Sequence, residues 1–286
     1  MGCKEFSKAA LVPTGIFFML VLMGQKLIRG IKMGFEDTGA GVPLVFVHGH
    51  PFDRSMWREQ MAAFNSKYRV IAPDLRGYGE SKAVADKTML YEFACDIAAL
   101  LDELKADDIV LCGLSMGGQI LFEFYRLFPL RVRALVLADT FAQLDDAERK
   151  QARYDTAERL LREGMHDYAE EVLPKMIAPE TIEMQPEVAA HVLSMMRGTS
   201  PKGAAAALRG RAERPDYTPL LSQINVPTLI VVGSRDEFTP VADAEFMHEK
   251  IPNSKLAVIE GAGHMPNLER PAEFNRVVEE FIKSLT

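Results

Sequence analysis

Cysteine is scarce in this chain of 286 residues, which contains only Cys3, Cys95 and Cys112. Three widely separated cysteines do not make the framework of paired bridges that holds small secreted domains together. Cys112 lies inside an apolar run, where a free thiol packs as a small hydrophobic side chain. The cysteine usage favours a reducing compartment, and we expect a cytoplasmic protein.

An excess of positive charge is also missing. The chain has 33 Lys and Arg against 40 Asp and Glu, a net charge of −7, with both signs mixed along its length. A surface for phosphate backbones needs a basic stripe, so nucleic acid is not an expected partner. With 48% hydrophobic and 26% charged residues, the composition is that of a well-cored globular protein.

No hydrophobic run is long enough to cross a bilayer. The apolar stretch Ala9–Met23 is interrupted by a proline and a glycine and falls short of the roughly 20 residues required. Two lysines precede Ile16–Met23, as in a secretion signal, but no A-x-A cleavage pattern follows. We expect residues 1–25 to be a leader ahead of the folded domain. A secretion signal and a membrane anchor are the alternatives, and only an anchor would imply membrane contact.

From residue 26 onward, short apolar runs alternate with helical patterns. The expected strands are Ile31–Asp37, Pro43–Val47, Arg69–Pro73, Ile109–Cys112, Arg133–Ala138, Thr228–Val232 and Lys255–Ile259. The expected helices are Arg54–Asn65, Tyr91–Leu104, Gly118–Phe128, Val241–Lys250 and Pro271–Leu285. This alternation predicts an α/β fold with a mostly parallel sheet and helices on both faces.

Residues 141–215 interrupt the alternation. They show no strand pattern, and we expect short, charged helices around Asp145–Glu163, Asp167–Met176, Pro186–Arg197 and Lys202–Arg211. An insertion between two strands of such a sheet lies above its carboxyl edge, where these folds bind ligands. The sequence thus predicts a core of residues 26–140 and 216–286 with a helical cap of residues 141–215. The alternative is a structural excursion without a role in binding substrate.

A G-x-S-x-G motif occurs at Gly113–Gly117, between an expected strand and an expected helix. In that setting the turn holds its serine, Ser115, in a strained conformation with the hydroxyl above the sheet. A serine hydroxyl becomes a good nucleophile only when a base removes its proton. Ser115 is therefore the candidate nucleophile.

The candidate base is His264, which directly follows the last expected strand. The candidate acid is Asp236, which follows the strand before it. Because both loops leave the carboxyl edge of the sheet, we expect the two side chains to meet Ser115 there. Asp139, at the end of another strand, is a rival for the acid.

These motifs resemble those of α/β-hydrolases over nearly all of residues 26–286. The matching segments, in family order, are His48–Pro51, Pro73–Ser81, the Ser115 turn, and the Asp236 and His264 loops. Within that fold the sequence is most similar to lidded bacterial serine esterases and their enol-lactonase and perhydrolase relatives. A serine nucleophile departs from haloalkane dehalogenases and epoxide hydrolases, which use a carboxylate.

The loop after Pro43–Val47 contains the pair His48 and His50, which can be interpreted as half of a metal site with Asp53 as a third ligand. No further ligand occurs at a suitable spacing, and we expect no metal. The resemblance instead implies that the backbone N–H groups of His50 and Met116 form an oxyanion hole. His48 would then be structural, with its ring buried.

The sequence supports weaker expectations for other residues. Phe52, Trp57 and Phe141 are candidates for the substrate pocket, although core packing is the favoured interpretation for Trp57. His166, His191 and His248 lie in charged helical segments and are expected to be ordinary surface or cap residues.

The predicted function is a serine hydrolase that cleaves small to medium carboxylic esters or lactones through an acyl-enzyme on Ser115, with no cofactor and no metal. A cofactor-free perhydrolase using the same triad and a non-catalytic ligand-binding protein are the alternatives. A homo-oligomer is possible from the sequence.

Overall fold

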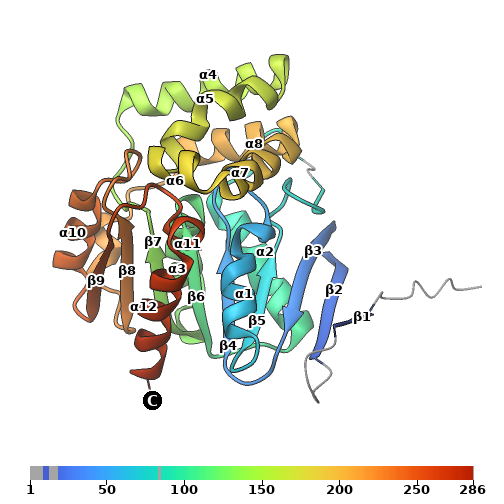
Figure 1. Ribbon diagram of the computed structural model, residues 1–286, viewed down its shortest axis with the longest axis vertical. Coiled ribbons are helices and arrows are strands. Elements are labelled where there is room, and N and C mark those ends of the chain that lie inside the picture. Colours follow the sequence, from blue (N-terminus) through green and yellow to red (C-terminus); the bar gives the residue numbers. More distant parts are fainter. Residues whose placement is uncertain (1–8, 13–18, 83–84, 286) are drawn as a thin grey trace, which may run out of the picture.

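A nine-stranded sheet runs through the part of the chain that the computed structural model describes, residues 9–12, 19–82 and 85–285 (Figure 1). The strands are β1 (Ala9–Val12), β2 (Met19–Ile28), β3 (Ile31–Thr38), β4 (Pro43–Val47), β5 (Arg69–Pro73), β6 (Ile109–Leu114), β7 (Val132–Ala138), β8 (Thr228–Gly233) and β9 (Ser254–Ile259). Their order is β1-β2-β3-β5-β4-β6-β7-β8-β9. The pairs from β5 through β9 are parallel, and β1, β2, β3 and β5 pair antiparallel. The expected mostly parallel sheet is confirmed.

The sheet begins earlier than the expected boundary at residue 26. β2 pairs with β3 from Leu22 opposite Asp37 to Ile28 opposite Ile31. The two strands are joined at Arg29 and Gly30, which have φ of 45° and 82°. Positive φ at both turn residues is typical of a tight hairpin. Residues 1–8 and 13–18 of the expected leader lie outside the described residues.

Helices cover both faces of the sheet (Figure 1). The core helices are α1 (Arg58–Phe64), α2 (Leu90–Leu104), α3 (Met116–Leu127), α9 (Thr218–Leu221), α10 (Val241–Lys250), α11 (Pro266–Glu269) and α12 (Pro271–Lys283), with 3-10 turns at Arg54–Trp57 and Pro129–Arg131. Helices α1 and α12 pack on one face, and α2, α3 and α10 on the other. No described helix combines the length and apolarity needed to cross a membrane.

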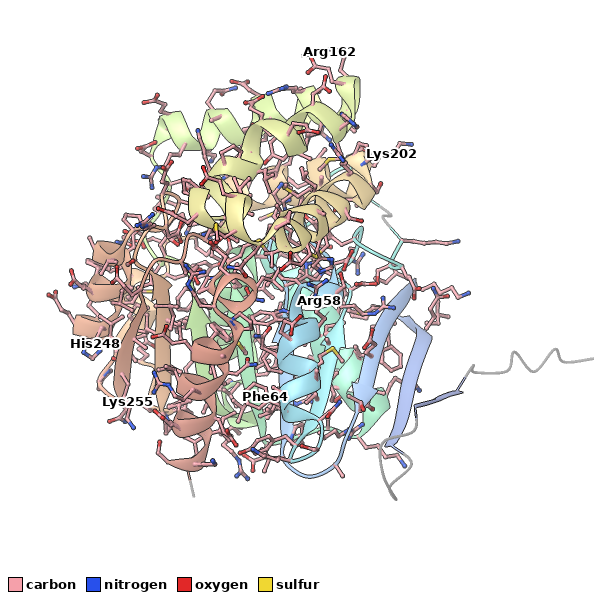
Figure 2. All side chains as sticks on the ribbon, viewed as in Figure 1. Arg58, Phe64, Arg162, Lys202, His248 and Lys255 are labelled. Carbon is pink, nitrogen blue, oxygen red and sulfur yellow. The ribbon has the colours of Figure 1, made fainter. Side chains whose placement is uncertain are left out.

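Alternation along the central strands creates the two halves of the core. On β4, Leu44 and Phe46 pack with α1 and α12, whereas Val45 and Val47 pack with α2 and α3. A strand buried on both faces is a continuous apolar run because successive side chains point to opposite sides. Figure 2 shows side chains filling the space between the sheet and its helices.

Five helices follow β7 in the chain and precede α9. They are α4 (Ala147–Glu163), α5 (His166–Met176), α6 (Pro179–Met184), α7 (Pro186–Gly198) and α8 (Pro201–Ala212). In Figure 1 they stand together above one end of the sheet, the end at which β6 leads into α3. They fall within the range 141–215 that the sequence assigns to a cap, and α6 is an addition to the helices expected there.

Candidate active site

Ser115 occupies the turn between β6 and α3 with φ of 57° and ψ of −117°. This is a rare conformation for a residue with a side chain. Its N–H donates to the Ala138 carbonyl at 2.9 Å, and its carbonyl accepts from Thr140 Oγ1 at 2.8 Å. Bonds to the neighbouring strand end therefore hold the strained backbone in place.

Glycines flank Ser115 because the chain approaches itself closely there. A Cβ at Gly113 would lie 2.6 Å from the Gly117 carbonyl carbon, and one at Gly117 would lie 2.2 Å from the Val47 oxygen. Such distances leave no room for a side chain at either position. The G-x-S-x-G spacing is thus a packing requirement of this turn.

His264 and Asp236 form a buried hydrogen-bonded pair. His264 Nδ1 lies 2.7 Å from Asp236 Oδ2, and both side chains are buried. Asp236 also accepts from the N–H groups of Phe238 and Thr239 and from the Thr239 hydroxyl. Burial acts to raise the pKa of Asp236, but the charge of His264 and these hydrogen bonds outweigh it and lower the pKa. The carboxylate therefore stays ionised against the imidazole.

A further buried carboxylate anchors the loop that carries His264. Glu269 accepts from the N–H groups of Gly263 and Met265 through Oε1, at 2.9 and 3.2 Å. Its Oε2 accepts from the Ala178 N–H and the Thr181 hydroxyl in the cap. Glu269 thus ties the imidazole loop to α6. Sequence reasoning missed this residue, because an acid at the end of a short helix gives no signal of burial.

Asp139, the rival acid, lies beside this pair. One ligand atom from each of Asp139, Asp236 and His264 lies within 4.8 Å of the others. Asp139 Oδ1 accepts from the Gly233 N–H at 2.9 Å. Burial, followed by the charge of Asp236, raises the pKa of Asp139 well above its usual value. The opposite directions of the two pKa shifts favour the negative charge on Asp236 over Asp139.

The β4 loop packs directly against the Ser115 turn. A Cβ at Gly49 would lie 2.9 Å from the Leu114 oxygen and 3.2 Å from Ser115 Cβ. Neither the His50 nor the Met116 backbone N–H has a hydrogen-bond partner within the described residues. Two free donors on segments that meet at the nucleophile suit an oxyanion hole.

The two histidines of this loop differ in their contacts. His48 is fully buried, with Nδ1 2.9 Å from the Gly49 oxygen and Nε2 accepting from the Leu75 N–H at 2.9 Å. Burial lowers its pKa. His50 Nδ1 lies 2.8 Å from the Tyr78 hydroxyl. Among the described residues His48, His50 and Asp53 do not bring three ligand atoms together, so they form no metal cluster there.

A cavity of about 490 Å³ opens over Ser115 and His264, and we call it the Ser115 cavity. It is lined by His50, Ser115, Phe141, Arg149, Ala152, Arg153, Thr156, Tyr168, Val172, Lys175, Met176, Leu208, Arg211, Glu237, Phe238, Thr239 and His264. Phe141 is in this wall, as the sequence suggested. Phe52 and Trp57 are not, because both are fully buried in the core beside Met56 and Phe46.

The remaining histidines lie away from Ser115. His166 is exposed, and His248 lies on α10 with its ring against Ser254 (Figure 2). His191 is half-buried and contacts the Ser55 oxygen at 3.1 Å. Cys112 is buried within β6 and packs in the core.

Several cationic residues of the cavity were not expected from the sequence. Arg153 and Arg211 lie in cap segments that have the charge pattern of solvated helices. The sequence of α8 does indicate that the helix is buried. Four consecutive alanines, Ala204–Ala207, give it no polar face, and a glycine lies on either side of them. A Cβ at Gly203 would lie 1.9 Å from the Gly77 oxygen, and one at Gly210 1.7 Å from the Thr88 oxygen. Arg211, in this closely packed helix, is buried.

Comparison with known proteins agrees with this architecture. Residues 42–271 match the family model described as the alpha/beta hydrolase fold. The chain is 34% identical over 240 residues to 3-oxoadipate enol-lactonase 2 of Acinetobacter baylyi, covering 84% of this chain and 88% of that protein.

Solved structures of related proteins have the same fold. A thermophilic esterase from Thermogutta terrifontis has a TM-score of 0.88 and 40% identity, covering 92% of this chain and 97% of its own. A bromoperoxidase from Bacillus anthracis has a TM-score of 0.81 and 27% identity, covering 92% and 99%. The chain belongs to the α/β-hydrolase family, in the group of serine hydrolases that includes esterases and enol-lactonases.

Proposed function

We propose that the protein hydrolyses carboxylic esters or lactones through an acyl-enzyme on Ser115. The observation that carries the proposal is the strained Ser115 turn in a cavity shared with His264, whose other ring nitrogen is held by Asp236. The esterase and enol-lactonase relatives support this class of reaction.

In the proposed reaction, His264 takes the Ser115 proton as the hydroxyl oxygen attacks the carbonyl carbon. The N–H groups of His50 and Met116 hold the oxyanion of the tetrahedral intermediate. His264 then gives the proton to the leaving alkoxide, and an acyl-enzyme remains. A water deprotonated by His264 attacks the acyl carbon and releases the acid, which restores Ser115.

A fluorophosphonate probe tests the nucleophile directly. We expect the probe to phosphonylate Ser115, with one adduct found on its peptide by mass spectrometry and parallel loss of 4-nitrophenyl ester hydrolysis. The reason is that only a serine activated by a base attacks phosphorus at neutral pH. The buried Cys112 and the exposed Ser222 provide internal comparisons. Adducts spread over several serines would contradict the proposal.

A perhydrolase is the second candidate, supported by the similarity to a bromoperoxidase. Hydrogen peroxide would replace water as the acceptor of the acyl group, giving a peracid and free Ser115. Peracid formation measured beside ester hydrolysis, with acetate and peroxide as substrates, separates the two activities. Peracid formed faster than the ester is hydrolysed would favour this candidate.

His50→Ala should lower kcat by less than about tenfold, because the backbone N–H is unchanged. A metal ligand would not tolerate the change. The measurement is kcat on a 4-nitrophenyl ester, before and after treatment with a chelator. A loss of about hundredfold or more, or strong inhibition by the chelator, would assign the imidazole an essential role.

A further inference from the structure

The Ser115 cavity has a surplus of positive charge. Its charged lining comprises Arg149, Arg153, Lys175 and Arg211 against a single carboxylate, Glu237. The whole chain has the opposite balance, with a net charge of −7. The positive cavity therefore does not follow from overall composition.

Arg211 is the most deeply placed of these cations, with only 8% of its surface exposed. Its Nε donates to Gln119 Oε1 at 2.8 Å, which is a neutral partner. Among the described residues its other N–H groups meet no acceptor, although a guanidinium has five donors. Burying a charge without a counter-ion is costly, so these donors are suited to an anion that enters the cavity.

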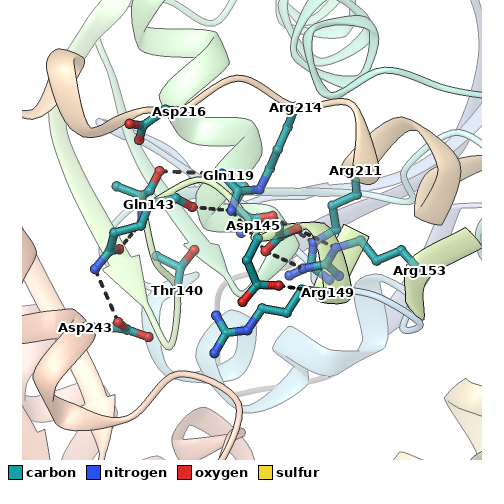
Figure 3. A network of polar contacts seen from close by, with 12 residues as sticks. Gln119, Thr140, Gln143, Asp145, Arg149, Arg153, Arg211, Arg214, Asp216 and Asp243 are labelled. Carbon is teal, nitrogen blue, oxygen red and sulfur yellow. Dashed lines mark hydrogen bonds and ion pairs between the residues drawn. The ribbon is translucent and has the colours of Figure 1, made fainter. Parts of the chain in front are cut away.

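The neighbours of Arg211 do not neutralise it. Arg153 and Arg214 lie nearby, and in the described structure one carboxylate, Asp145, bonds to both of them (Figure 3). Arg153 holds Asp145 through two hydrogen bonds, at 2.7 and 3.2 Å. Burial and the positive charges of Arg153 and Arg214 lower the pKa of Arg211 by more than the charge of Asp145 raises it, but a guanidinium keeps its proton at neutral pH. The cluster therefore has unmatched positive charge at Arg211.

The guanidinium of Arg211 is tied to the element that carries the nucleophile. Gln119 lies one helical turn after Ser115, and its N–H donates to the Ser115 carbonyl at 3.2 Å. The charge of Arg211 also acts on His50, which lines the same cavity and bears a proposed oxyanion donor. An anion on Arg211 would thus lie in the same cavity as the reacting carbonyl.

The four cations that line the cavity differ in their exposure. Arg149 and Lys175 are exposed, Arg153 is half-buried and Arg211 is buried. Positive charge at the cavity surface attracts an anion, and the N–H groups of the buried Arg211 guanidinium can then bind it.

We propose that the substrate is an ester or lactone bearing a free carboxylate, which the Arg211 guanidinium binds with Arg153 beside it while Ser115 attacks the carbonyl. This inference rests on the proposed ester hydrolysis and adds the substrate class. Arg211 is then the residue that determines specificity for charge.

The test compares two 4-nitrophenyl esters of glutaric acid, one with a free distal carboxylate and one in which that carboxylate is capped as its methyl ester. We expect wild-type kcat/KM to be about tenfold or more higher for the anionic ester, the effect of a charge-assisted hydrogen bond. Arg211→Met should remove this preference, which is measured as the ratio of kcat/KM for the anionic ester to kcat/KM for the capped ester, so that a general change in activity affects both values and cancels. Arg211→Lys should keep part of it, because the charge remains without the fork.

Arg159→Met is the matched control, because Arg159 is a cap arginine paired with Glu163 and Glu171 outside the cavity. It should keep the wild-type preference.

Glutarate should inhibit wild-type hydrolysis of a neutral ester more strongly than glutaramide, a measurement that needs no variant. Equal wild-type kcat/KM for both esters, with hydrolysis still dependent on Ser115, overturns the substrate class alone. Hydrolysis that survives in Ser115→Ala overturns the proposed function itself.

Discussion

Replacing Ser115 with alanine is expected to lower kcat for ester hydrolysis by about 10⁴-fold or more, because no other hydroxyl can form the acyl-enzyme. The fold should be retained. The Ser115 backbone bonds to Ala138 and Thr140 do not involve its side chain, and alanine at φ of 57° has strain similar to that of serine. The measurement is single-turnover and steady-state kinetics on a 4-nitrophenyl ester, with the melting temperature recorded alongside.

Ser222→Ala is the matched control, since Ser222 is exposed at the end of α9 and lies far from the cavity lining. Its kcat should equal that of the wild type. If Ser115→Ala has the wild-type melting temperature and still hydrolyses the ester at the wild-type rate, Ser115 is not the nucleophile.

Most of the sheet could be predicted from the sequence because buried parallel strands leave a strong signal. PLVFV at Pro43–Val47 became β4 with the expected bounds, and RVIAP at Arg69–Pro73 became β5. The antiparallel edge could not be predicted in the same way. β2 has the sequence MLVLMGQKLI. Its apolar run is typical both of a strand and of a secretion signal, so the sequence does not distinguish them. The short helices α6, α9 and α11 were missed because four to six residues give no helical period.

The candidate triad could be placed from the sequence because topology alone brings the carboxyl ends of parallel strands together. The cavity wall could not, since it depends on which way each side chain points. Phe52 follows the β4 loop closely in the chain, yet its ring turns into the core, whereas Arg211, far away in α8, turns toward Ser115. The position of the Arg211 charge therefore could not be predicted from the sequence, because it depends on how α8 packs over the sheet.

Asp236→Asn is expected to lower kcat by about 10³- to 10⁴-fold, because an amide stabilises neither the correct tautomer of His264 nor its imidazolium. Asp139→Asn is the matched comparison, with the same change on the carboxyl group next to it. It should lower kcat by less than about tenfold, since burial and the Asp236 charge raise the pKa of Asp139 and favour its neutral form, which an amide resembles. Asparagine also tolerates the φ of 44° at this position. The reverse ranking of the two variants would make Asp139 the acid of the triad.

Thermal unfolding across pH provides an independent test of the charge on Asp139. Its folded pKa is raised above the unfolded value of about 3.9, so its contribution to stability is complete below that value and is lost as pH rises toward the folded pKa. Asparagine does not titrate and avoids this loss. The melting temperature of Asp139→Asn relative to the wild type should therefore increase between pH 4 and pH 8, whatever constant offset the amide introduces. A difference in melting temperature that stays constant or falls over this range would mean that Asp139 is ionised in the folded protein. Both carboxylates, Asp139 and Asp236, would then contribute negative charge beside His264.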